Sequence, residues 1–217
     1  MDLQGKKVLF LGDSITEGHG TSSAENGFVS VFEKMSGATA VNYGIGGTRI
    51  AKQTAKSADA NHDRDFIERA DEMESEADAV VVFGGTNDYG HGDALLGNFQ
   101  SDDEYTFYGA MHSLCKKLIS KYPKSNIVFM TPLHRLDESV LKFKEDAKNG
   151  VTLKVYVDII KEIAGYYGLP VLDLFNTSGM QPNVDIIREM YMPDGLHPSD
   201  AGAKKLAERV YSFMKAL

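Results

Sequence analysis

Short apolar runs alternate with longer amphipathic stretches along the whole chain, and this alternation most constrains how the chain can fold. Each run is rich in Val, Ile, Leu or Phe and is bounded by turn residues, which is typical of a short buried strand. The predicted strands cover residues 7–12, 38–44, 77–85, 125–133 and 169–175.

The stretches between these runs carry apolar residues at helical spacing. Strands that alternate with helices form right-handed βαβ units and a mostly parallel sheet. The sequence therefore predicts an α/β fold in one domain, residues 1–217, with a five-stranded sheet covered by helices on both faces. The predicted helices cover residues 27–35, 103–122, 151–168 and 198–217, and Gly168 suits the position just past a helix end.

The charge balance narrows the range of partners. The formal net charge is −8, whereas binding to nucleic acid needs clustered Lys and Arg and docking on anionic membranes needs basic residues. Cys115 is the only cysteine, so no internal disulfide can form. No signal peptide and no apolar stretch of about 20 residues is visible. We therefore expect a cytoplasmic protein without nucleic-acid or stable membrane partners; nothing in the sequence predicts an oligomeric state.

Glycine and polar residues gather just after the predicted strands. In open parallel sheets, ligands bind outside the carboxyl ends of the strands, so these segments predict the position of a site. They are Gly12-Asp13-Ser14 after the first strand, residues 42–50 after the second, residues 84–88 after the third, residues 131–134 after the fourth, and residues 192–202, with Asp194 and His197, after the last.

His197 follows Asp194 by three residues, a spacing that can bring the two side chains together within one turn. A carboxylate on one ring nitrogen leaves the other free to accept a proton from a hydroxyl, and Ser14 is the candidate hydroxyl. Taken alone, the pattern is better explained by a turn at Asp194-Gly195 that precedes a helix. The same edge of the sheet offers donors for an oxyanion: the Ser14 N–H, an N–H among Gly44, Gly46 and Gly47, and the Asn87 amide. Each also has an interpretation as an ordinary turn residue.

Four ordered segments carry a family resemblance. "GDSIT" (12–16), "GIGGT" (44–48), "GGTND" (84–88) and "DGLHPS" (194–199) resemble the four blocks of the SGNH hydrolase superfamily, the GDSL esterases and lipases. The resemblance implies a flavodoxin-like three-layer α/β/α fold and no cofactor or metal. It implies Ser14 as nucleophile, His197 as base and Asp194 as its partner, with an oxyanion hole of Ser14, Gly47 and Asn87. Gly47 is chosen because it lies five residues after Asn42, as in the family. Asp13 and Asp88 are expected to be structural.

Other classes of site fit less well. A Gly-x-Ser-x-Gly elbow and a phosphate loop ending in Gly-Lys-Ser/Thr are both absent from the sequence. The six histidines form no His-x-x-x-His pair, so no metal site is predicted. A binding module that holds a small ligand without turnover, and a lysophospholipase or thioesterase of the same superfamily, remain as alternatives to a serine esterase.

Two long connections, residues 89–104 and 133–150, would overhang the site and set the choice of substrate; surface insertions with some helix are the alternative. Within or beside them, Tyr89, His91 and His134 are the candidate substrate contacts. The mixture of polar and apolar residues at 89–99 distinguishes neither an acyl tunnel nor a sugar cleft. The lack of a membrane-binding amphipathic surface favours a small-molecule ester with a short acyl or acetyl group, acetylated carbohydrates included.

Overall fold

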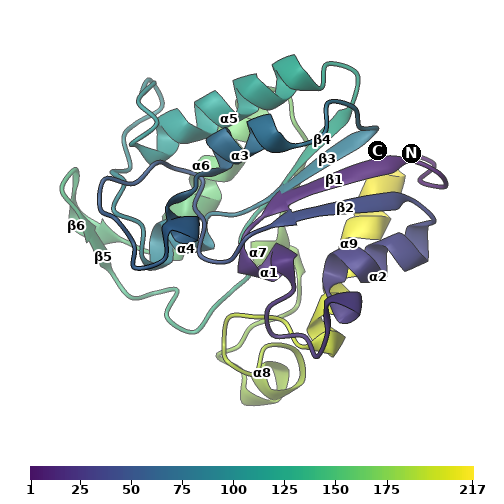
Figure 1. The fold of residues 1–217 in the computed structure, drawn as a ribbon. Helices are drawn as coiled ribbons and strands as arrows, with labels where there is room; N and C mark the ends of the chain where they lie inside the picture. Colours follow the sequence, from purple (N-terminus) through teal and green to yellow (C-terminus); the bar gives the residue numbers. More distant parts are fainter.

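Five parallel strands form the centre of the computed structural model, which describes residues 1–217 apart from the side chain of Lys148 (Figure 1). Their order, β2-β1-β3-β4-β7, is the flavodoxin-like order 2-1-3-4-5 when only the strands of this sheet are counted. The strands are β1 (Lys7–Gly12), β2 (Thr39–Gly44), β3 (Ala79–Phe83), β4 (Asn126–Met130) and β7 (Val171–Leu172).

The sheet separates two apolar cores, because successive residues of a strand point to opposite faces. Leu9 and Val80 face one core, whereas Val8, Phe10 and Val81 face the other. Helices α3, α5 and α6 cover the first face and helices α2 and α9 the second, as Figure 1 shows. The predicted three-layer α/β/α fold is therefore confirmed. These covering helices are α2 (Phe28–Ser36), α3 (Phe66–Glu72), α5 (Phe107–Lys121), α6 (Leu153–Tyr166) and α9 (Asp200–Ala216).

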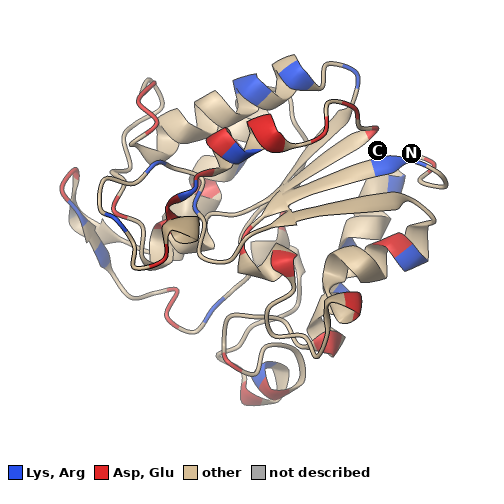
Figure 2. Cartoon of the chain, in the orientation of Figure 1, with Lys and Arg blue, Asp and Glu red and all other residues tan. Residues whose placement is uncertain are grey.

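Short elements fill the connections between these layers. The α-helical ones are α1 (Ser14–Glu17), α4 (Thr86–Gly90), α7 (Leu174–Thr177) and α8 (Asp185–Tyr191), and the 3₁₀ turns are η1 (Ala24–Asn26) and η2 (Ala60–Asp63). Of the helices that the structure describes, none has both the length and the hydropathy that a membrane crossing needs. Charged side chains lie mainly on the outer helices and loops, and the central strands are almost free of them (Figure 2).

Capping residues explain where the helices begin. The hydroxyl of Thr106 accepts a hydrogen bond from the Gly109 N–H at 3.1 Å, so α5 begins at Phe107 and not at residue 103. Ser199 caps α9 in the same way, at 3.3 Å from the Gly202 N–H. Gly168 follows α6 with φ +68°, the left-handed conformation that suits a residue just past a helix end.

The connection at residues 133–150 differs from the expectation of some helix. It contains an antiparallel hairpin of β5 (Lys142–Lys144) and β6 (Ala147–Val151). Asp146, at the turn of this hairpin, accepts hydrogen bonds from the backbone of Leu96 and Gly97 at 3.2 and 2.7 Å. These bonds tie the hairpin to the other long connection, in which residues 91–104 form turns and a bridge.

The last strand of the sheet is shorter than predicted. Only Val171 and Leu172 are in strand conformation, because Asp173 ends the strand by capping α7. Its carboxylate accepts a hydrogen bond from the Asn176 N–H at 3.2 Å. The chain therefore leaves the sheet after the two residues of β7 and continues as α7.

Candidate active site

Ser14 is presented by a sharp turn at the carboxyl end of β1. The strand ends at Gly12, where a Cβ atom would lie only 1.9 Å from Oγ1 of Thr16, so only glycine fits. Asp13 caps the following turn of helix, its carboxylate accepting a hydrogen bond from the Ile15 N–H at 3.0 Å. Ser14 is the first residue of α1 and keeps 6% of its surface exposed.

A chain of two hydrogen bonds runs from Ser14 to Asp194. Oγ of Ser14 lies 2.9 Å from Nε2 of His197, and Nδ1 of the same ring lies 2.6 Å from Oδ2 of Asp194. Because the carboxylate requires a proton on Nδ1, Nε2 of the neutral imidazole is left as an acceptor for the hydroxyl proton. Such an arrangement can activate a hydroxyl as a nucleophile.

The turn that contains Asp194 also keeps its carboxylate ionised. Its Oδ1 accepts hydrogen bonds from the N–H groups of Leu196 and His197 at 2.8 and 2.7 Å. Although partial burial alone would raise the pKa of Asp194, these bonds and the His197 ring hold it below its ordinary value. Asp194 is therefore ionised at neutral pH and can stabilise a positive charge on the ring.

Three candidate donors surround the hydroxyl. The N–H groups of Ser14 and Gly47 donate no hydrogen bond to any residue that the structure describes. Asn87 is buried, and its Nδ2 donates one hydrogen to the Thr48 carbonyl at 3.0 Å, which leaves its second hydrogen free. Ser14, Gly47, Asn87 and His197 line one cavity of about 300 Å³. Donors that converge in this way can stabilise negative charge on a carbonyl oxygen.

The conformation of Gly47 depends on the absence of a side chain. Its φ is +74°, and a Cβ atom would lie 2.6 Å from the ring of His62. Gly46, by contrast, has its N–H engaged by the Glu17 carboxylate at 2.6 Å. Of the two glycines, only Gly47 presents an unused N–H to the cavity.

Asp13 and Asp88 are buried carboxylates next to this cavity. Asp88 accepts hydrogen bonds from the N–H groups of Ile50 and Ala51 at 3.1 and 2.9 Å, which fixes the loop after β2. Burial raises the pKa of Asp88 to about 6 and that of Asp13 to about 7. Their contacts are with the backbone, as expected for residues with a structural role.

The three candidate substrate contacts have different positions. His91 lines the cavity. Tyr89 does not: its ring is 1% exposed and packs edge-on against Tyr156, and its hydroxyl donates to the Asp137 and Val140 carbonyls. The prediction that Tyr89 contacts a substrate is therefore inconsistent with the structure.

His134 also lies outside the lining of the cavity. Its Nδ1 is 2.8 Å from the Glu138 carboxylate, and its ring is 4.0 Å from that of Phe175, measured between centroids. One contact is within its own connection and the other is with α7, and the structure does not place His134 among the residues that line the cavity.

Some residues that line the cavity were not predicted from the sequence as site residues. The cavity is also lined by His19, His62, Arg135 and Leu196. Arg135 follows β4 at the sheet edge where the other site residues lie, and this position was the one available signal for it. Among the residues that the structure describes, no group of three or more His, Cys, Asp or Glu side chains is placed to hold a metal ion.

Comparison with known proteins agrees with this geometry. The sequence profile of the GDSL-like Lipase/Acylhydrolase family matches residues 10–205. The α/β/α fold and the Ser-His-Asp arrangement are those of a hydrolase. The protein belongs to the GDSL-like lipase/acylhydrolase family. A comparison with curated proteins finds no significant match.

Solved structures show how widely the fold is shared. One crystal structure is 32% identical with a TM-score of 0.87, and the match covers 100% of this chain and 99% of that one. A protein from Lactobacillus plantarum is 28% identical with a TM-score of 0.80, covering 98% of both chains. The lipase/acylhydrolase from Enterococcus faecalis is 20% identical with a TM-score of 0.66, covering 97% of this chain and 96% of that one, which supports a common fold only.

Proposed function

We propose that the protein is a serine ester hydrolase that works through an acyl-enzyme on Ser14. The observation that carries this proposal is the hydrogen-bonded chain from Ser14 Oγ to His197 Nε2 at 2.9 Å and from His197 Nδ1 to Asp194 at 2.6 Å. Membership of a lipase/acylhydrolase family supports it independently.

The mechanism has two steps of acyl transfer. In the first, Ser14 Oγ attacks the ester carbonyl while its proton passes to Nε2 of His197, and Asp194 stabilises the imidazolium. The oxyanion accepts hydrogen bonds from the Ser14 and Gly47 N–H groups and from Asn87. When the C–O bond breaks, the alcohol leaves with the proton from His197. In the second step, water gives a proton to His197 and its oxygen attacks the acyl carbonyl; the carboxylic acid leaves as Ser14 recovers its proton. No cofactor is required.

The cavity supports a short acyl group. Its volume is about 300 Å³, at the small end for ligand sites. We therefore propose acetyl or other short-chain esters as substrates, with acetylated carbohydrates among them.

A chain-length series tests the proposal. Purified protein is assayed with p-nitrophenyl esters from C2 to C12 and with acetylated xylose, beside the Ser14→Ala variant. Ser120→Ala is a matched control, because Ser120 is an exposed residue of α5. We expect the highest kcat/KM at C2 to C4, full activity in Ser120→Ala and none in Ser14→Ala.

Three outcomes would contradict the proposal in different ways. Binding of esters without turnover would identify a non-catalytic ligand-binding module. A maximum at C10 or longer would leave the esterase in place but overturn the short-chain assignment in favour of a lipase or lysophospholipase. Faster turnover of acyl thioesters than of matched oxygen esters would point to a thioesterase.

A further inference from the structure

One permanent positive charge lines the cavity that contains Ser14, although the protein as a whole is acidic. Its lining includes Arg135 and four imidazoles, those of His19, His62, His91 and His197, and it includes no Asp or Glu side chain. The chain as a whole carries a formal net charge of −8. A positive group without a carboxylate beside it in an acidic protein attracts an anion to one place while the rest of the surface repels it.

Arg135 is the only cavity-lining residue with a permanent positive charge. Its Nη1 donates to the carbonyl and the hydroxyl oxygen of Thr86 at 3.2 and 3.3 Å. The guanidinium also lies over the ring of Tyr89, 5.6 Å from its centroid. The bonds and the ring hold the head group at the cavity wall, while Nε and Nη2 form no hydrogen bond with the residues that the structure describes.

This guanidinium lacks the carboxylate partner that three other arginines of the described chain have. Arg64 and Arg188 each form an ion pair with a carboxylate. Within the described part of the chain, no carboxylate lies within 4.0 Å of Arg135. Glu138, three residues away, uses its carboxylate for His134, Gln181 and the backbone N–H of Arg135. A half-buried arginine held in place without a counter-ion is suited to accept one from a ligand.

Gly90 makes room for this head group. A Cβ atom at Gly90 would lie 2.9 Å from Nη1 of Arg135. Gly90 also lines the cavity. A side chain at this position would push the guanidinium away from its present place, so the position of Arg135 can be altered without changing its charge.

His91 adds a neutral donor beside it. Nη2 of Arg49, a buried residue, lies 2.6 Å from Nδ1 of His91. Since a guanidinium only donates, Nδ1 must accept, and the ring proton is on Nε2. Desolvation and the charge of Arg49 lower the pKa of His91 to about 4, so the ring stays neutral. Asp63, 4.0 Å from Nη1 of Arg49, offsets part of the Arg49 charge, which leaves Arg135 as the main cationic group at the cavity.

We infer that this cavity selects esters that carry a compact oxyanion, a carboxylate or a phosphate, which Arg135 binds while Ser14 attacks the ester. This inference rests on the proposed function and names the substrate class of the same site. The fork of Nε and Nη2 can donate two parallel hydrogen bonds to a carboxylate or phosphate, and a neutral ester of the same length gains neither bond.

The test compares matched pairs of esters. Mono-p-nitrophenyl succinate and p-nitrophenyl butyrate share a four-carbon acyl chain and differ by a carboxylate. Acetylated glycerol phosphate and acetylated glycerol form the second pair, which differs by a phosphate on the alcohol side of the ester. We expect the wild-type kcat/KM to be roughly 10- to 100-fold higher for the anionic member of at least one pair. The free energy of a hydrogen bond to a charged group corresponds to a rate ratio of this size. Which pair shows the preference distinguishes carboxylate from phosphate.

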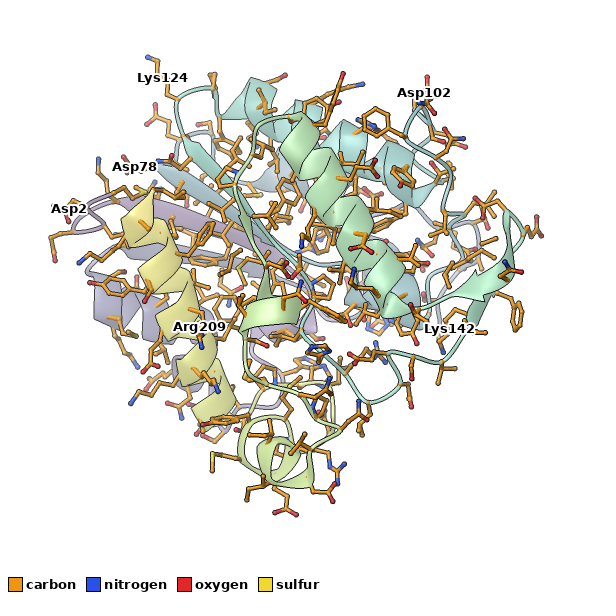
Figure 3. The ribbon with its side chains drawn as sticks, turned by 180° about the vertical axis from the view of Figure 1, so that it is seen from behind. Asp2, Asp78, Asp102, Lys124, Lys142 and Arg209 are labelled. Carbon is orange, nitrogen blue, oxygen red and sulfur yellow. The ribbon has the colours of Figure 1, made fainter. Side chains whose placement is uncertain are left out.

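Variants of Arg135 show whether this residue is responsible. In Arg135→Gln the ratio of anionic to neutral kcat/KM should fall by about tenfold or more, and in Arg135→Lys it should be intermediate because the charge remains but the fork is lost. Gly90→Ala should lower the ratio as well. Arg209→Gln is the matched control: it removes one positive charge from the exposed side of α9, away from the cavity, where Figure 3 labels it. Because the ratio is taken within one variant, partial loss of folding does not affect it.

A binding measurement separates this inference from the proposed function. Succinate should raise the Tm of the wild-type protein and not that of Arg135→Gln. If neutral esters are hydrolysed but neither pair shows a preference and succinate has no effect, the anion site is overturned and the esterase stands. If no ester is hydrolysed but succinate stabilises the protein through Arg135, the anion site stands and the esterase is overturned.

Discussion

Oγ of Ser14 lies 2.9 Å from Nε2 of His197, although 183 positions separate the two residues in the sequence. The hydroxyl lies just after the first strand of the sheet, and the imidazole precedes the last helix. Oδ2 of Asp194 holds the imidazole at Nδ1, and two backbone N–H groups hold Oδ1 in a turn in which Gly195 has φ +79°. The site therefore exists only when the two ends of the chain are packed on the same sheet.

Replacing Asp194 by Asn tests the orienting role of the carboxylate. The amide can present its NH₂ group to Nδ1, which would place the ring proton on Nε2 and remove the acceptor for Ser14. We expect kcat to fall by about 10²- to 10⁴-fold with little change in Tm. Asp185→Asn, at an exposed position of α8 that pairs with Arg188, is the control and should keep wild-type kcat. An unchanged kcat in Asp194→Asn would contradict the role.

Asn87 is expected to donate to the oxyanion and not to bind the ground state. In Asn87→Ala, kcat should fall by about 10²- to 10³-fold while KM changes little. Asn87→Asp keeps the shape of the side chain but, when ionised, has no hydrogen to donate, so it should lose as much. Steady-state kinetics with p-nitrophenyl acetate measures both variants. If Asn87→Asp retained wild-type kcat, the donor role would be wrong.

Gly47→Ala is expected to impair the oxyanion site for two reasons. Alanine is strained at φ +74°, which costs about 1 kcal/mol, and its Cβ atom would lie 2.6 Å from the His62 ring. We expect a fall in both Tm and kcat/KM. The double variant Gly47→Ala/His62→Ala removes the clash but not the strain, so its Tm should recover only in part. Gly46→Ala serves as the comparison because Gly46 has no positive φ; equal losses at both glycines would contradict this explanation.

Asp13 is expected to make stability depend on pH. Burial raises its pKa to about 7 in the folded protein from an ordinary value of 3.8. The folded state therefore binds this proton more tightly than the unfolded chain, and ionisation of the group lowers stability. The cost is absent below about pH 4, grows as the pH rises, and is complete above about pH 7.

Asp13→Asn removes this titration while keeping an oxygen that can accept from the Ile15 N–H. The difference in Tm between Asp13→Asn and wild type should become more favourable to the variant between pH 4 and pH 8, measured by calorimetry at fixed ionic strength. Because only the difference is used, carboxylates that do not interact with Asp13 cancel, whereas Asp88, whose charge helps to raise the pKa of Asp13, contributes to the same transition. A difference that stays constant over this range would show that Asp13 does not change its protonation there.

Patterns within single segments predicted most of the fold. The runs at β1, β3 and β4 are continuously apolar because both faces of these strands are buried, and such runs are distinctive. The hairpin of β5 and β6 was missed because its residues are mostly polar and its place depends on Asp146 reaching the backbone of Leu96 and Gly97. That contact joins two connections about 50 residues apart, and no local pattern encodes it.

The residues of the candidate site, like the elements of the fold, were predicted only in part. Ser14, Asn87, Asp194 and His197 follow strands or open helices in recognisable segments, and the structure brings them together at the predicted edge. Tyr89 was misplaced because it turns inward from α4, and a tyrosine in a polar segment gives no sign of that direction. Arg135 lies in an irregular loop and His62 in the 3₁₀ turn η2. Sequence periodicity does not predict where such segments run, so it did not predict that both residues line the cavity.

Covalent labelling of the native protein tests the nucleophile most directly. The protein is treated with a fluorophosphonate, and the modified residue is located by tandem mass spectrometry of the digested chain. We predict one adduct, on Ser14, that forms in step with the loss of p-nitrophenyl acetate hydrolysis and is absent from Ser14→Ala. Complete loss of hydrolysis with the adduct on another residue, or active hydrolysis by Ser14→Ala, would contradict the assignment of Ser14 as the residue that receives the acyl group.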